Sequence, residues 1–187
     1  MARLHEYQGK ALLRARGVET PEGAAVRTPD EAAAVATRLG GRVVVKVQAW
    51  TTSRKAQGGV RFADTPAEAR AAAADMLGMT FGNFPVEEVL VERCLDIRHE
   101  LFISLTIDDA AQAPLLLLDV RGGSGIEDRA ATVARIPLDV ESGVDPARLR
   151  AELATSSIDA SSHEDLVRAV STIVDLARDV EARSFEV

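Results

Sequence analysis

The sequence has a single cysteine, only three lysines and no long apolar run in its 187 residues. One cysteine, Cys94, excludes an internal disulfide and is typical of a reducing compartment, so we expect a cytoplasmic protein. No apolar segment approaches the roughly 20 residues that cross a bilayer. The first residues also lack the apolar stretch of a signal peptide. We therefore expect no membrane partner.

Acidic residues outnumber basic ones, 29 to 22. The formal net charge is −7, which argues against nucleic acid as a partner, because phosphate backbones attract proteins that can neutralise them. The hydrophobic content of 47% is too high for a disordered chain. The length allows one core, or two small lobes that share a cleft.

Two of the three lysines lie in the segment 43–60, VVVKVQAWTTSRKAQGGV. Because lysine is rare in this sequence, their presence here suggests a specific role. Its β-branched run predicts a buried strand that carries Lys46, and a buried ammonium is costly unless an anion meets it. The following loop adds Arg54 and Lys55 and ends in Gly58-Gly59, before a returning strand. Two interpretations fit this segment equally well: a binding site for phosphates, or a solvated turn next to a lysine on an edge strand.

The remaining pattern predicts an α+β fold. Thr28 and Thr65 are each followed by a proline and an acidic residue, which is typical of a helix start. Ser162 and Asp165 suggest a capping box. The nucleotide motifs GxGxxG and GxxxxGK[ST] do not occur. Helices are expected at about 4–16, 28–39, 65–77, 146–154 and 162–181, and strands at 24–27, 42–48, 60–63, 87–92, 100–107, 114–120 and 131–138.

Several motifs, in this order and spacing, resemble the β subunits of succinyl-CoA synthetases and related ADP-forming acyl-CoA ligases. The opening L-H-E-Y-Q-x-K is the most specific of them. The others are V-V-K-x-Q, R-K-x-x-G-G-V, L-V-E, D-I-x-x-E-L and G-G-x-x-I-E, which begin at residues 44, 54, 90, 96 and 122.

The resemblance implies an ATP-grasp fold, in which two α+β lobes grip ATP. Residues 20–95 would form the first lobe, and residues 1–19 with 96–187 the second. The resemblance further implies that the second lobe is incomplete and that the family's C-terminal flavodoxin-like domain lies outside this sequence.

The resemblance also implies a set of site residues but no catalytic one, since the family's phosphohistidine lies on another subunit. Lys46 would meet the phosphates beneath the loop, Glu92 would sit at the adenine edge, and Glu100 would take ribose hydroxyls or a phosphate-bound cation. Without the resemblance, a solvated charged turn is favoured for both acids. The expected nucleotide-binding residues are Lys46, Ser53, Arg54, Lys55, Glu92, Leu95 and Glu100, and the expected magnesium ligand is Glu186.

The implied function is the nucleotide-binding part of an acid–CoA ligase β subunit that couples ATP, or GTP, with magnesium to thioester formation. The chain alone is expected to be inactive. Its expected partners are an α-type ligase subunit, a separate C-terminal half, or further copies of itself. The alternative is a shortened, non-catalytic paralogue that acts as a binding or interaction subunit. The phosphate loop supports this alternative, because Thr51-Thr52-Ser53 replaces glycines that let backbone amides approach phosphate.

Overall fold

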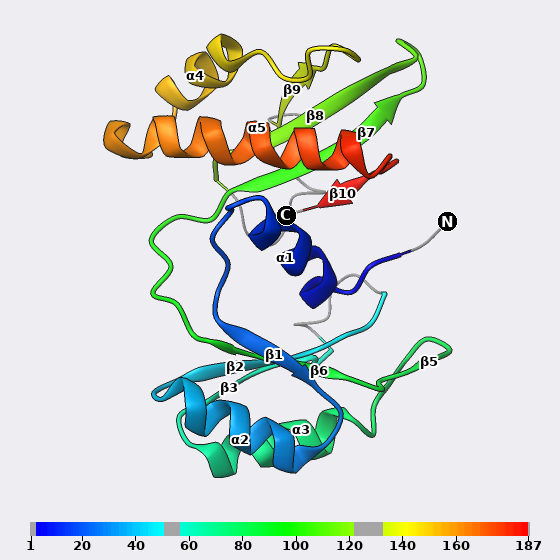
Figure 1. Ribbon diagram of the computed structural model, residues 1–187, viewed down its shortest axis with the longest axis vertical. Coiled ribbons are helices and arrows are strands. Elements are labelled where there is room, and N and C mark those ends of the chain that lie inside the picture. Colours follow the sequence, from blue (N-terminus) through cyan, green and yellow to red (C-terminus); the bar gives the residue numbers. More distant parts are fainter. Residues whose placement is uncertain (1–2, 51–56, 122–132, 187) are drawn as a thin grey trace. The chain divides into compact units, whose positions relative to one another are not determined.

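The computed structural model describes residues 3–50, 57–121 and 133–186 (Figure 1). The chain divides into two compact units, Met1–Asp96 and Ile97–Val187. Each unit combines helices with an antiparallel sheet, so the predicted α+β class is confirmed. The division into lobes predicted from the sequence places residues 1–19 differently, in the second lobe, and that assignment stays a prediction.

The first unit is built on a four-stranded sheet in the order β1-β6-β2-β3, with every neighbouring pair antiparallel. Two helices of similar length pack against each other and against one face of this sheet (Figure 1). The strands are β1 (Gly23–Val26), β2 (Val43–Val47), β3 (Val60–Ala63) and β6 (Val89–Arg93), and the helices are α2 (Pro29–Leu39) and α3 (Pro66–Met76).

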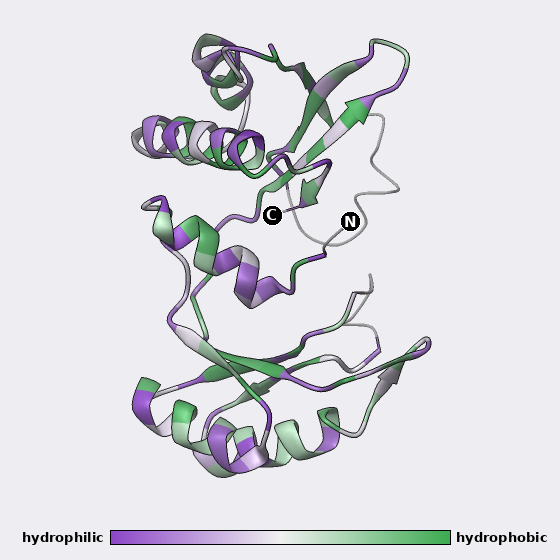
Figure 2. Cartoon of the chain, turned by 45° about the vertical axis from the view of Figure 1, so that its right-hand side comes forward, coloured by the Kyte–Doolittle hydropathy of each residue, from purple (hydrophilic) through white to green (hydrophobic). Residues whose placement is uncertain are grey.

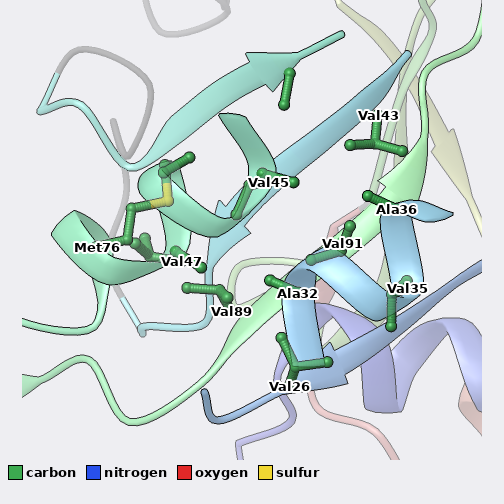
Figure 3. Packing of buried hydrophobic residues seen from close by; sticks show 14 of the residues in the cluster. Val26, Ala32, Val35, Ala36, Val43, Val45, Val47, Met76, Val89 and Val91 are labelled. Atoms are coloured by element: carbon green, nitrogen blue, oxygen red, sulfur yellow. The ribbon is translucent and has the colours of Figure 1, made fainter. Parts of the chain in front are cut away.

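Alternation along the strands forms the core of this unit. Val43, Val45 and Val47 of β2 are fully buried on the face toward α2 and α3, because successive side chains of a strand point to opposite faces (Figure 3). Alanines on both helices let the helices approach the sheet closely, and Met76 fills the remaining space. The central strands are accordingly green in the hydropathy view (Figure 2).

Both helices begin as the sequence predicts. Thr28 Oγ1 accepts a hydrogen bond from the Glu31 amide at 3.2 Å, and Thr65 Oγ1 accepts one from the Glu68 amide at 3.2 Å. A proline occupies the first helical position in each case, where its missing N–H costs nothing. These caps satisfy amides that the helix itself leaves without partners.

The first unit also contains helix α1 (Glu6–Ala15), which is followed by its C-cap Arg16 and by Gly17 with a φ of +79°. None of its residues is buried. A small hairpin of β4 (Thr80–Phe81) and β5 (Phe84–Pro85) completes the unit, and the sequence analysis did not predict it.

The second unit has a sheet in the order β10-β7-β8-β9, again with antiparallel neighbours. Helix α5 alternates purple and green around its axis in Figure 2, and its buried residues recur at helical spacing, as at Val167, Val170, Val174 and Ala177. The elements are β7 (Phe102–Asp108), β8 (Ala113–Asp119), β9 (Ala134–Pro137), β10 (Phe185–Glu186), α4 (Pro146–Ala154), the 3-10 turn η2 (Ala160–Ser162) and α5 (His163–Asp179).

The capping box predicted at Ser162 is wrong. Ser162 ends the 3-10 turn in a helical conformation, and its side chain makes no capping bond to α5. Asp159 caps instead, one turn earlier, by accepting a hydrogen bond from the Ser161 amide at 2.8 Å. A short acceptor in front of the 3-10 turn therefore replaces the expected cap.

Candidate functional site

The face of the first unit's sheet that points away from α2 and α3 carries charge. Val44 and Lys46 of β2 lie on this face, as do Leu90 and Glu92 of β6. The register pairs Val44 with Glu92 and Lys46 with Leu90, so Lys46 and Glu92 are diagonal neighbours. The sheet therefore brings together two residues that the sequence analysis assigned to one nucleotide site.

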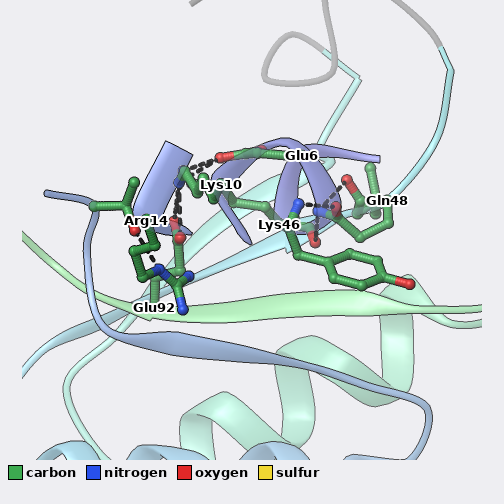
Figure 4. A network of polar contacts seen from close by, with 9 residues as sticks. Glu6, Lys10, Arg14, Lys46, Gln48 and Glu92 are labelled. Atoms are coloured by element: carbon green, nitrogen blue, oxygen red, sulfur yellow. Dashed lines mark hydrogen bonds and ion pairs between the residues drawn. The ribbon is translucent and has the colours of Figure 1, made fainter. Parts of the chain in front are cut away.

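Helix α1 adds two further charges to this face. Glu6 and Lys10 are four residues apart, so they share one side of the helix, and their side chains pair at 2.8 Å. The Glu6 carboxylate and the Lys10 ammonium both reach the strand residues (Figure 4). The helix thus contributes two residues that were absent from the expected site.

The four side chains form a closed ring of alternating charge, which we call the charge ring: Glu6, Lys10, Glu92 and Lys46. Lys10 Nζ donates to both carboxylate oxygens of Glu92 at 2.7 Å. Lys46 Nζ donates to Glu92 Oε2 at 3.0 Å and to Glu6 Oε1 at 2.8 Å. Glu6 Oε1 also accepts from Lys10 at 2.8 Å, so the ring is closed and its formal charge is zero.

The ring is unevenly shielded from solvent. The side chain of Glu92 is 1% exposed, whereas those of Lys10, Glu6 and Lys46 are 17%, 19% and 23% exposed. A carboxylate as buried as Glu92 needs ionic partners and hydrogen bonds, and the two lysines provide both. The solvated turn considered for Glu92 is therefore not what this part of the chain forms.

Protonation in the ring follows from its geometry. Burial by itself raises the pKa of Glu6, but the Lys46 and Lys10 ammonium groups together outweigh burial and hold this pKa at about 2. Burial lowers the pKa of Lys46, and the Glu6 and Glu92 carboxylates outweigh it and raise that pKa above its ordinary value. Glu6 and Lys46 are therefore both charged at neutral pH.

The start of α1 is attached to the end of β2 by further contacts. The Tyr7 amide donates to Gln48 Oε1 at 3.3 Å, and Gln48 is buried. The imidazole of His5 stacks on Trp50 with ring centroids 4.6 Å apart, and Trp50 meets Phe84 edge to face. These contacts place the opening motif beside Gln48 and Trp50, which directly precede residues 51–56 in the sequence.

The other expected site residues are found in different surroundings. Leu95 follows β6 and is 51% exposed. Glu100, in the second unit, lines an open pocket of about 470 Å³ together with Arg98, His99 and Arg121. Ser53, Arg54 and Lys55 lie outside the described residues. Their assignment to a nucleotide site, like that of Leu95 and Glu100, stays a prediction.

A magnesium site is not assembled by the described side chains. Within residues 3–50, 57–121 and 133–186, no three His, Cys, Asp or Glu side chains gather where they could hold a metal. Glu186 lies on β10 and is exposed. Magnesium prefers several oxygen ligands, and this lone carboxylate does not provide them.

Glu6 and Lys10 are the residues that the sequence analysis missed. Their i, i+4 spacing in LHEYQGK predicts an ion pair on a helix. The contact between Lys10 and Glu92 spans 82 residues of sequence, and no local pattern indicates it. The strong resemblance of this motif was the one signal that its residues do more than form a helix.

Comparison with known proteins agrees with this architecture. A crystal structure from Pyrococcus horikoshii has the same fold with a TM-score of 0.78 at 19% identity, covering 98% of this chain and 81% of that one. Residues 3–187 match the family model described as the ATP-grasp domain. The chain belongs to this family, and the predicted ATP-grasp fold is confirmed.

The relatives are β subunits of CoA ligases, as the motifs indicated. The succinate–CoA ligase [ADP-forming] subunit beta of Rubrobacter xylanophilus is 35% identical over 188 residues, which are 98% of this chain and 49% of the relative. The succinate–CoA ligase [GDP-forming] subunit beta of Thermus thermophilus is 42% identical over 128 residues, 68% of this chain and 34% of the relative. The chain spans about half the length of the Rubrobacter relative and about a third of that of the Thermus one.

The described helices include none that is both long and apolar enough to cross a bilayer.

Proposed function

We propose that this chain is the nucleotide-binding part of an acid–CoA ligase of the β-subunit type, and that Lys46 and Glu92 belong to its nucleotide site. The observation that carries the proposal is their meeting on one sheet face, with Lys46 next to the last residue of β2. Membership of the ATP-grasp family and similarity to ADP-forming and GDP-forming β subunits support it.

In this proposal Lys46 meets the phosphates of the nucleotide. A hydrogen bond between an ammonium and a phosphate oxygen contributes about 1.5–3 kcal/mol, more than a neutral pair, because both groups are charged. Ser53, Arg54 and Lys55 in the following loop would add donors above the phosphates. The ring already holds the Lys46 ammonium against the strand, so little side-chain freedom remains to be lost on binding.

Glu92 and Leu95 would face the base, and Glu100 would accept hydrogen bonds from the ribose hydroxyls or organise a phosphate-bound cation. Relatives of both the ADP-forming and the GDP-forming kind occur, so we propose ATP as the nucleotide and GTP as the alternative. Magnesium would enter with the phosphates, and Glu186 is the one residue of this chain that we propose as a magnesium ligand.

The reaction proposed for the complete ligase couples nucleotide cleavage to thioester formation and needs the parts of the enzyme that this chain does not span. The proposed partner is an α-type subunit or a second polypeptide that carries the remainder of the ligase, in the cytoplasm. Self-association is the competing proposal. No residue described here is assigned a covalent step.

A second candidate function is a non-catalytic binding subunit. One feature favours it: the sequence has Thr51, Thr52 and Ser53 where the family resemblance implies glycines, and the two β-branched threonines restrict the close approach of backbone amides to phosphate. The two candidates differ in whether the chain binds nucleotide.

Calorimetric titration of the chain with ATP, ADP and GTP, with and without magnesium, tests the proposal. We expect wild type to bind ATP and the Lys46→Met variant to bind about tenfold more weakly or worse, as expected when one charge-assisted contact is lost. Arg38→Met, on the exposed end of α2, removes the same charge elsewhere and controls for net charge. Absence of binding by wild type under all conditions would favour the binding-subunit candidate.

A further inference from the structure

Lys46 already has two anionic partners within its own unit, and any phosphate that binds it must share it with them. Glu6 Oε1 lies 2.8 Å from its Nζ and Glu92 Oε2 lies 3.0 Å from it. An ammonium has three donors, and two of them point at these carboxylates. The affinity of Lys46 for phosphate therefore depends on how firmly each carboxylate is held.

The two carboxylates are held differently. Glu92 is 1% exposed and lies within a central strand. Both of its carboxylate oxygens accept hydrogen bonds from Lys10 Nζ at 2.7 Å. Glu6 is 19% exposed and belongs to α1, a helix in which no residue is buried. Moving Glu92 would disturb the sheet, whereas the Glu6 side chain can turn away from Lys46 without moving a strand. Glu6 is therefore the partner that can give way.

We propose that Glu6 competes with the nucleotide phosphates for Lys46 and thereby sets the nucleotide affinity of this chain. This inference rests on the proposed nucleotide site. Phosphate binding exchanges one ionic partner of Lys46 for another: Glu6 releases Lys46 and stays paired with Lys10, which it contacts at 2.8 Å. The opening motif LHEYQGK thus acquires a role in ligand affinity as well as in the helix.

Charge accounting gives the sign of the effect. The ring contains two ammonium and two carboxylate groups, so a phosphate approaching Lys46 meets no net attraction from it. Neutralising Glu6 leaves the remaining three groups with a net charge of +1. A phosphate is then attracted by the ring and no longer competes with the Glu6 carboxylate, while Glu92 stays in contact with Lys46.

The test is titration of wild type, Glu6→Gln and Lys46→Met with ATP, and with tripolyphosphate as a probe that lacks base and ribose. We expect Glu6→Gln to bind both ligands about three- to tenfold more tightly than wild type at low salt, and the difference to shrink as salt is added. Glu164→Gln removes the charge of an exposed glutamate paired with Arg150 and should bind like wild type.

The outcomes separate this inference from the proposed function. If wild type binds ATP, Lys46→Met does not, and Glu6→Gln binds equally or more weakly, then the nucleotide site stands and the competition by Glu6 is overturned. If neither wild type nor Glu6→Gln binds either ligand, both proposals fail. Tighter binding that is matched by Glu164→Gln would reflect net charge and would also overturn the competition.

A second measurement needs no variant and remains decisive if Glu6→Gln does not fold. The sequence contains only three lysines, so isotope labelling of lysine and glutamate side chains gives few lysine signals to assign by NMR. We expect ATP to shift both the Lys46 side-chain signals and the Glu6 carboxylate carbon, because their contact is broken. A shift at Lys46 with none at Glu6 would contradict the exchange.

Discussion

Glu92 is the residue on which the candidate site depends most. Its side chain is 1% exposed, and two lysines neutralise it. Replacing Glu92 with Gln removes one charge of a buried network and leaves Lys10 and Lys46 to share Glu6. We expect the free energy of unfolding to fall by about 3–5 kcal/mol, the range seen when one partner of a buried ion pair is removed. Urea unfolding followed by circular dichroism measures it.

Glu22 is a suitable control for this prediction. It pairs with Arg93 at 3.5 Å, and its side chain is 62% exposed. The Glu22→Gln variant should lose less than about 1 kcal/mol, because water screens exposed pairs. Equal stability of the two variants would mean that the charge ring contributes no more than a surface ion pair.

The pKa of Glu6 predicts a dependence of stability on pH. The folded-state pKa is about 2 and the ordinary value is 4.5, so the folded state favours the charged form. Its contribution to stability is fully present above about pH 4.5 and is lost as the pH falls toward 2. We expect the free energy of unfolding of wild type to exceed that of Glu6→Gln by about 2–3 kcal/mol at pH 7. Urea titrations at several pH values between 7 and 3 should show this difference shrinking; a constant difference would contradict the assignment.

The sequence predicted two of the four ring residues, and the reason is physical. Lys46 was noticeable because a charge within a β-branched run needs a partner, whereas Glu92 was assigned only through the family resemblance, since the residue pattern alone favoured a solvated turn. The partner of Lys46 was expected to be a phosphate, whereas within the chain it is a pair of carboxylates. Glu6 was read only as part of a helix, since its contact with Lys46 spans 40 residues.

At the scale of elements, two glycines predict opposite effects of the same substitution. A Cβ added at Gly23 of β1 would lie 2.5 Å from the Val91 carbonyl oxygen and 2.9 Å from the Glu92 Cα, both backbone atoms of β6. Gly23→Ala should therefore separate these strands and destabilise the first unit, by about 1–3 kcal/mol on the usual cost of overpacking. The same change would disturb Glu92 through its own strand.

Gly9→Ala is the matched control. Gly9 lies within α1, and an added Cβ meets nothing within 4 Å. Because alanine favours helix over glycine, this variant should be more stable by about 0.5–1 kcal/mol. Thermal unfolding of both variants checks the pair, and a destabilising Gly9→Ala would argue against the helix.

Local signals predicted most of the elements because their causes are local. Threonine caps, prolines at the first helical position and alternating valines each act within a few residues, and α2, α3, β2 and β3 were confirmed. The short strands β4, β5 and β10 were missed, since two-residue strands depend on a partner elsewhere in the chain. The cap at Ser162 failed because the 3-10 turn before α5 displaced the capping residue to Asp159.

At the scale of the whole molecule, each unit has buried apolar residues of its own. The core cluster that includes β2 and β6 draws all its buried members from residues 26–91. In the second unit, buried residues such as Leu116, Leu118 and Ile136 come from its own sheet, together with apolar residues of α4 and α5. Damage to one interior should therefore be felt first in its own unit.

Leu118→Asp tests this separation. Leu118 of β8 is 2% exposed, and an unpaired carboxylate at this position costs several kcal/mol, enough to unfold a marginally stable unit. Hydrogen exchange followed by mass spectrometry should show lost protection in β7, β8 and β9, while β1, β2 and β6 stay protected. Val140→Asp places the same charge at a position that is 69% exposed and should leave both sheets protected. Loss of protection in both units of Leu118→Asp would show that the first unit depends on the second for its stability, and nucleotide binding should then be measured only on chains in which both are intact.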